Sequence, residues 1–159
     1  MHLVQTLLRT NWRDRLLFFE AVGLSLLAWS AIHILPFRIV AGWIGRQQEA
    51  TAVEPEGTTD QKLIRRVRWA VEATSRRVPW KCKCLAQAMI ARSMLGRRGV
   101  SGTVHFGLTK SSASLEGHAW LQTGDTTVTG RVGLHNYTTM TKFAFGASRA
   151  AILNRTESR

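Results

Sequence analysis

The fold is decided by the stretch between residues 78 and 110, which reads VPWKCKCLAQAMIARSMLGRRGVSGTVHFGLTK. Pro79 ends any helix that precedes it, because a proline ring fixes φ and lacks an N–H group. From Cys84 to Gly96, apolar residues recur with the i, i+3, i+4 spacing of a helix. Further on, Val104, Phe106 and Leu108 alternate with other residues, which is typical of a half-buried strand. The stretch therefore predicts a helix that leads through a short basic turn into a strand.

A second helix is predicted just upstream, over residues 60–77. Thr59 or Asp60 can cap its first turn. Apolar or small residues repeat at helical spacing along one side, and basic residues occupy the others. The repeating residues are Leu63, Val67, Ala70, Val71 and Thr74. Residues 47–60 before this helix hold four acids, a proline and a glycine, so we expect an exposed linker there.

The N-terminal region carries a run of twenty mostly apolar residues from Leu16 to Leu35, with Glu20 and His33 as its ionisable members. A helix of this length could cross a bilayer, form part of a core, or lie in a membrane interface. Arginines flank the run on both sides, so they give no inside–outside asymmetry. Pro36 ends the run and the sequence FRIVAGWIG resumes as a shorter helix, which predicts a helical hairpin.

Strand patterns dominate the C-terminal half. The segment LEGHAWLQT meets Gly124-Asp125 and returns as TTVTGRV, which predicts a hairpin. One further short strand or helix and a frayed polar end are expected after it. We therefore predict an α+β fold with helices first and an antiparallel sheet second. The expected parts are an apolar helical region at 1–46, a linker at 47–60 and a core at 61–159.

Composition narrows the class of protein. The chain has 159 residues, 45% of them hydrophobic, which is enough for a core and excludes overall disorder. Its net charge of +12 favours acidic partners such as a carboxylate-rich peptide, nucleic acid or an anionic membrane. Nucleic acid is disfavoured as a partner, since the arginines are not interleaved with an aromatic platform.

The first ten residues lack a secretory signal pattern. The chain has two cysteines, Cys82 and Cys84, with a single residue between them, which makes a disulfide bond between them geometrically awkward. A secreted scaffold held by disulfides is therefore excluded, and we expect a cytoplasmic location.

Cys84 is the candidate nucleophile because it falls where a helix begins. Two lysines, Lys81 and Lys83, come just before it in the sequence. Unpaired N–H groups, the helix dipole and nearby ammonium charges all stabilise a thiolate. Of the five histidines, His118 is the best placed to exchange a proton with it. A cysteine on a helix facing a histidine on a strand is the arrangement of papain-like and transglutaminase-like sites. Cys82 precedes the helix and is interpreted as structural.

Zinc chemistry is the rival interpretation, with Cys82, Cys84, His105 and His118 as four ligands. The spacing of these residues does not match a standard structural zinc motif. The sequence also contains no phosphate-binding glycine loop and no H-E-x-x-H motif. We therefore predict neither a cofactor nor a metal.

Residues 78–130 resemble the core of the lasso-peptide B-type leader peptidases, a bacterial branch of the transglutaminase-like cysteine proteases. The matching motifs are Trp80, Cys84-Leu85, Gln87-Ala88, Met94-Leu95, Arg97-Arg98-Gly99, Gly107 and His118-Ala119-Trp120. The upstream apolar segment is similar to the N-terminal helices of that family, so the resemblance covers most of residues 12–130.

The resemblance implies a cysteine peptidase that removes the leader from the precursor of a ribosomally made natural product. A macrolactam cyclase would then close the lasso ring. No leader-binding module fits before residue 12, so the chain resembles the split form that acts with a separate small leader-binding protein. Two alternatives stay open: an acyl transferase of the transglutaminase type, and a basic membrane-associated binding protein without catalysis.

Carried onto this sequence, the family's mechanism assigns the attack on the scissile carbonyl to Cys84 and the proton transfers to His118. The Cys84 backbone N–H would stabilise the oxyanion, with Gln87 as one candidate for a second donor. The family can place an aspartate twelve residues after the histidine, where this chain has Gly130. Asp125 is the nearest downstream carboxylate and the candidate third member. A backbone carbonyl or Thr129 could orient the imidazole in its place.

Overall fold

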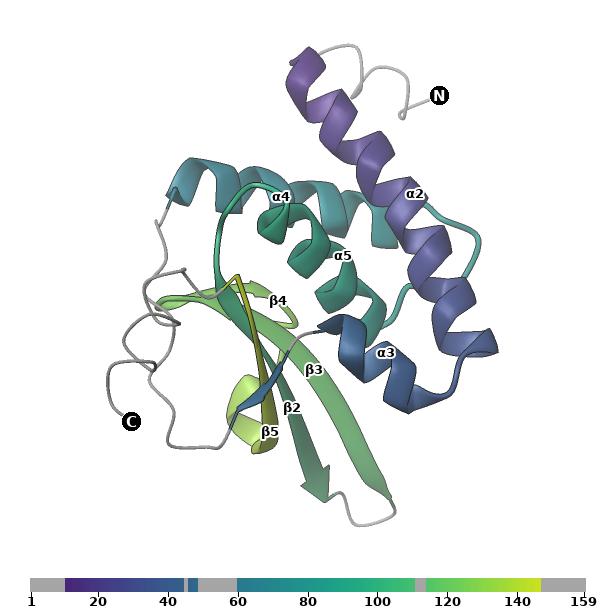
Figure 1. Cartoon of the computed structure of the whole chain (residues 1–159), viewed down its shortest axis with the longest axis vertical. Coiled ribbons are helices and arrows are strands. Elements are labelled where there is room, and N and C mark those ends of the chain that lie inside the picture. The colour runs from purple at the N-terminus through teal and green to yellow at the C-terminus, as the bar shows by residue number, and fades with distance from the viewer. Residues whose placement is uncertain (1–10, 45, 49–59, 111–113, 147–159) are drawn as a thin grey trace, which may run out of the picture.

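The computed structural model describes residues 11–44, 46–48, 60–110 and 114–146. Helices α4 (Gln61–Ser75) and α5 (Cys84–Gly96) pack on one face of a five-stranded antiparallel sheet, and α2 (Trp12–Ile34) packs on these two helices (Figure 1). This arrangement confirms the predicted α+β class, with a helical hairpin followed by a helix-on-sheet core. The core is continuous across the two layers, and it includes fully buried Ile64 of α4, Met94 of α5 and Leu121 of the sheet.

The helical hairpin consists of α2 (Trp12–Ile34) and α3 (Phe37–Ile44). Pro36 separates the two helices, as the sequence predicts. One side of α2 packs on α4 and α5 through Leu17, Ala21 and Ala28. The other side is exposed, so α2 is half-buried rather than a full core helix. By length and composition α2 could also cross a membrane, with a mean hydropathy of 1.7.

Helices α4 (Gln61–Ser75) and α5 (Cys84–Gly96) lie between α2 and the sheet. The Oδ1 atom of Asp60 accepts hydrogen bonds from the backbone N–H groups of Lys62 and Leu63, at 3.0 and 3.1 Å. This is the side-chain cap that the sequence predicts. Helix α5 is buried on most sides because it is covered by helices on one side and by the sheet on the other.

The sheet has the strand order β1-β5-β2-β3-β4. Its members are β1 (Arg46–Gln48), β2 (Gly102–Lys110), β3 (Leu115–Thr123), β4 (Thr126–Thr129) and β5 (Thr138–Phe145). The predicted hairpin is present as β3 and β4, with Gly124 and Asp125 in its turn.

One feature differs from the sequence prediction. Strand β1 takes the first residues of the expected linker and pairs with β5, because its backbone groups complete that edge of the sheet. The further element expected after the hairpin is the eight-residue strand β5, which lies between β1 and β2. A short 3-10 helix, Leu134–Asn136, precedes it. The rest of the linker and the predicted frayed tail, 49–59 and 147–159, lie outside the described residues.

Candidate active site

Cys84 is the first residue of α5, where a helix leaves backbone N–H groups without intrahelical partners. The preceding residue, Lys83, is extended and makes no side-chain cap hydrogen bond. The first backbone bond of the helix runs from the Gln87 N–H to the Lys83 carbonyl, at 3.0 Å. The Cys84 N–H is therefore placed to stabilise negative charge next to its own sulfur.

Gln87 has a structural contact. Its Nε2 atom donates a hydrogen bond to the Cys82 carbonyl at 2.9 Å. This bond ties the second turn of α5 to the segment that leads into it. Gln87 therefore holds the segment before Cys84 against the helix, and its role as a second oxyanion donor stays a prediction.

Cys84 and His118 line the same cavity, which has a volume of about 380 Å³. His118 lies on β3, opposite Gly107 of β2. Most of the remaining wall is apolar, and it is built from α5 and the strands β2, β3 and β5. The other lining residues are Leu85, Phe106, Gly107, Leu108, Gly117, Ala119, Met140, Thr141 and Phe143. The two residues that the sequence selects thus line one cavity, although they are 34 positions apart.

The imidazole of His118 is held by a backbone carbonyl. Its Nε2 atom lies 2.9 Å from the carbonyl oxygen of Gly130. A carbonyl can only accept, so Nε2 must carry the proton. In the neutral ring Nδ1 is then the basic nitrogen, which is the state required to take a proton from a thiol.

Gly130 itself makes this contact possible. Its φ of +72° lies in the left-handed region that favours glycine. A Cβ atom built on it would lie 2.6 Å from the Ala119 carbonyl oxygen and 3.0 Å from the His118 Nε2 atom. Gly130 stands twelve residues after His118, and its main-chain oxygen is the hydrogen-bond acceptor beside the imidazole.

Aromatic rings also confine His118. The Tyr137 ring stacks on the imidazole with centroids 4.9 Å apart, and the Trp120 ring lies 6.1 Å away. A Cβ on Gly107 would meet the Trp120 ring at 2.8 Å, so a glycine is needed opposite the histidine. The sequence reasoning missed Tyr137. It is the single tyrosine of the chain, but it lies in a segment without a clear pattern, and only the folded sheet brings it to His118.

The structure does not bring Asp125 to His118. Asp125 is exposed in the two-residue turn between β3 and β4, where Thr123 pairs with Thr126. Seven residues separate it from the histidine, which corresponds to roughly 20 Å at the usual strand rise. Thr129 is buried on β4 opposite Leu121, and the hydrogen bond at the imidazole goes to Gly130 instead. The geometry thus supports the backbone-carbonyl alternative.

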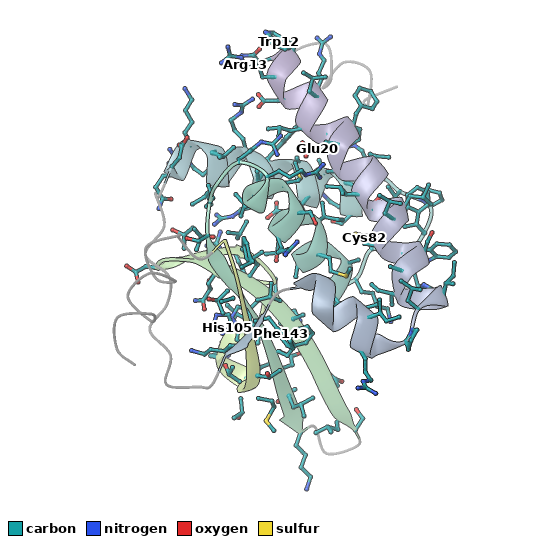
Figure 2. All side chains as sticks on the ribbon, viewed as in Figure 1. Trp12, Arg13, Glu20, Cys82, His105 and Phe143 are labelled. Carbon is teal, nitrogen blue, oxygen red and sulfur yellow. The ribbon has the colours of Figure 1, made fainter. Side chains whose placement is uncertain are left out.

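Cys82 lies in a different environment, half-buried against the apolar core (Figure 2). Burial raises the pKa of its thiol to about 11, so it stays protonated at neutral pH. This is consistent with the interpretation of Cys82 as structural.

The four-ligand zinc hypothesis is not supported. His105 is buried and stacks on Trp120 with ring centroids 5.2 Å apart. Within the described ranges no group of three or more His, Cys, Asp or Glu side chains is arranged to hold a metal ion. Cys84 and His118 share their cavity with apolar residues rather than with further ligands.

The fold and this site fit a protein of the transglutaminase-like class, in which a cysteine on a helix and a histidine on a strand line one cavity. Comparison with family models gives a match to the transglutaminase-like superfamily over residues 31–142. The chain belongs to this superfamily, whose members usually use cysteine chemistry as proteases or acyltransferases. Searches of curated proteins and of solved structures find no match to the chain.

Proposed function

We propose that the protein is a cysteine peptidase with Cys84 as the nucleophile and His118 as the general base and acid. The observation that carries the proposal is the cavity that both residues line, Cys84 from a helix start and His118 from the sheet. The backbone carbonyl of Gly130 fixes the tautomer of the imidazole. A peptide bond bound in the cavity would lie beside both residues and the backbone N–H of Cys84. These are the components that acyl transfer requires.

In the first half of the reaction, Nδ1 of His118 takes the thiol proton and the Cys84 sulfur bonds to the scissile carbonyl carbon. The carbonyl electron pair moves to oxygen, where the Cys84 N–H stabilises the charge. When the carbonyl re-forms, the C–N bond breaks and the imidazolium gives its proton to the departing amine. The acyl part of the peptide stays on Cys84 as a thioester.

In the second half, His118 takes a proton from water and the resulting hydroxide attacks the thioester. Collapse of this intermediate breaks the C–S bond, releases the new carboxylate and returns the proton to the sulfur. An amine in place of water would give a transferred acyl group. Mass spectrometry of the product distinguishes this acyl-transfer alternative from hydrolysis.

We further propose that the substrate is the precursor of a lasso peptide and that the cut falls just after its leader. Support comes from the resemblance of residues 78–130 to the B-type leader peptidases. A small leader-binding protein would present the precursor, and a lasso cyclase would act on the released core peptide. The action would take place in the cytoplasm, where the two free thiols stay reduced.

The test is cleavage of a lasso precursor in the presence of a leader-binding partner. Cys84→Ala should abolish cleavage, since no other thiol lines the cavity among the described residues. Cys82→Ala is the matched control, and it should retain most of the activity if it folds. Full activity of Cys84→Ala would overturn the peptidase proposal.

A specific observation also favours a membrane contact for α2. An uncharged exposed stripe runs along the helix, and it consists of Trp12, Leu16, Phe19, Leu26, Leu27 and Ile34. Both acids of α2 are neutralised by arginines from other elements: Asp14 by Arg66, and Glu20 by Arg97 and Arg98. Exposed Arg13 stacks over the Trp12 ring at the far end of the helix (Figure 2). An apolar face bordered by arginine and tryptophan suits the surface of an anionic bilayer.

Co-sedimentation with vesicles tests this contact. The protein should bind vesicles that contain phosphatidylglycerol, with a loss of binding at high salt. Phe19→Gln should weaken binding, whereas Leu115→Gln, which changes an exposed apolar residue on the sheet, should not. Equal binding by both variants would refute a role for the stripe.

A further inference from the structure

The cavity beside Cys84 is strongly apolar, although it adjoins a site for chemistry. Apart from the catalytic pair and Thr141, every side chain that lines it is apolar, and two of its members are glycines. A cavity whose only task was to admit water would not need this lining. A volume of about 380 Å³ is within the range of pockets that bury a ligand group.

The glycines and Ala119 keep the cavity open. Gly107 and Gly117 contribute no side chain, and Ala119 contributes a single methyl group to the wall. The rings of Phe106 and Phe143 both line the cavity, with centroids 5.5 Å apart. Both rings belong to or pack against the main core, so this part of the wall is held in place. A group bound in the cavity beside Cys84 therefore meets a fixed apolar surface.

Met140 forms part of the outer wall. Its side chain is 63% exposed, although it lines the cavity. An exposed large apolar residue is unremarkable alone, but here it borders the cavity that Cys84 and His118 also line. A ligand side chain in the cavity would cover Met140 and remove its apolar surface from water.

We infer that this cavity binds an apolar side chain of the substrate close to the scissile bond and thereby sets the cleavage preference. The inference rests on the proposed function, because the occupant must reach the cavity while its peptide bond lies at Cys84. The substrate class is a peptide with a leucine-like or phenylalanine-like residue within two positions of the acyl carbon. A charged side chain would be disfavoured there, because the walls offer almost no polar groups.

The experiment uses small peptide chloromethyl ketones, which need no leader-binding partner. The Cys84 sulfur attacks the methylene carbon of the reagent, a C–S bond forms and chloride leaves. Two series are compared, acetyl-X-Gly-chloromethyl ketone and acetyl-Gly-X-chloromethyl ketone, with Leu, Phe, Gln or Glu at X. In one of the series Leu and Phe should inactivate the protein about 10- to 100-fold faster than Gln or Glu.

Variants then assign the preference to the cavity. Met140→Lys should reduce the advantage of Leu over Gln by about tenfold, and Met140→Leu should restore it. Leu115→Lys is the matched control: this residue is 67% exposed on β3 and does not line the cavity. It should leave the preference unchanged.

Iodoacetamide separates the two ways in which the idea can fail. Equal inactivation by all peptides, with rapid alkylation of Cys84 by iodoacetamide, would overturn the apolar subsite and leave the nucleophile intact. Slow reaction of Cys84 with every reagent would overturn the proposed function itself. A preference that survives Met140→Lys unchanged would also contradict the inference.

Discussion

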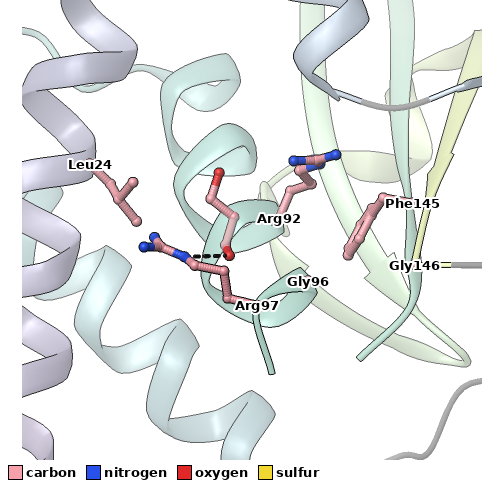
Figure 3. A pocket seen from close by; sticks show the side chains of 7 residues that line it. Leu24, Arg92, Gly96, Arg97, Phe145 and Gly146 are labelled. Carbon is pink, nitrogen blue, oxygen red and sulfur yellow. Dashed lines mark hydrogen bonds between the residues drawn. The ribbon is translucent and has the colours of Figure 1, made fainter. Parts of the chain in front are cut away.

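The two ends of α5 each open into a cavity, but their chemistry differs. The cavity at the N-terminal end has a volume of about 380 Å³, and its mostly apolar wall includes Cys84 and His118. The C-terminal cavity is larger, about 480 Å³, and is lined by Leu24, Arg92, Ser93, Gly96, Arg97, Phe145 and Gly146 (Figure 3). No thiol or imidazole is among these described lining residues. The size of a cavity is therefore a poor guide to the position of the site in this protein.

The polarity of the helix explains the difference. At the C-terminal end, Arg97 and Arg98 donate hydrogen bonds to the carbonyls of Ser93 and Met94, at 3.2 and 2.8 Å (Figure 3 shows the first). The helix dipole stabilises cationic groups at this end of α5. Both arginines also form ion pairs with Glu20 of α2. At the N-terminal end no side chain caps the N–H groups, which suits a developing anion. One end serves stability and the other is available for chemistry.

The largest loss of activity should follow a substitution in the cavity at the N-terminal end of α5. His118→Ala should lower the rate of peptide cleavage by about 10²- to 10⁴-fold, because it removes the group that transfers the proton. The check is kcat/KM for a precursor peptide, with the free energy of unfolding measured alongside. Activity close to that of the wild type would separate His118 from the reaction.

A smaller loss should follow a change in the contact that orients the imidazole. Gly130→Ala should lower activity by more than tenfold, since the new Cβ would approach the His118 Nε2 atom and the Ala119 carbonyl. Gly133→Ala is the matched control. It has the same left-handed φ, +71° against +72°, but its Cβ would meet no atom closer than 3.8 Å. If both variants lose activity equally, backbone strain rather than the imidazole contact is the cause.

These variants separate what the sequence predicts from what only the fold reveals. Helix α5 begins and ends at Cys84 and Gly96, as its apolar spacing and flanking turns predict. Such local signals also predict the β3–β4 hairpin and select Cys84 and His118 as candidate site residues. The carbonyl of Gly130 gives no signal in the sequence, because every residue has a carbonyl and its direction depends on a local turn. The position of β5 and its neighbour Tyr137 depends on long-range pairing that periodicity does not encode.

A pH-dependent change in the free energy of unfolding is expected from His105, which is buried on β2. Burial, with the charge of Lys142, lowers the pKa of His105 to about 4. The unfolded chain therefore binds a proton at higher pH than the folded chain does. The free energy of unfolding should fall as the pH drops from about 6.5 to 4, by up to about 3 kcal/mol. Comparing wild type with His105→Phe, which keeps a ring beside Trp120, isolates this term; identical pH profiles would contradict it.

The smallest effect is expected at the C-terminal end. Glu20→Gln should lower the free energy of unfolding by about 1 kcal/mol or less, because its two arginine partners are partly exposed. Cleavage activity should stay within about twofold of the wild type. Thermal unfolding and an activity assay on the same sample check both values. A large loss of activity would mean that the two ends of α5 are coupled.

The central claim, that Cys84 is the reactive nucleophile, is tested most directly by limiting iodoacetamide at pH 7, with peptide mapping and cleavage activity followed in parallel. With a pKa of about 11, only about one Cys82 thiol in 10⁴ is ionised at this pH. The account predicts that carbamidomethylation appears first on Cys84 and that activity falls in proportion to it. Modification of Cys82 first, or full cleavage activity after complete alkylation of Cys84, would contradict the claim.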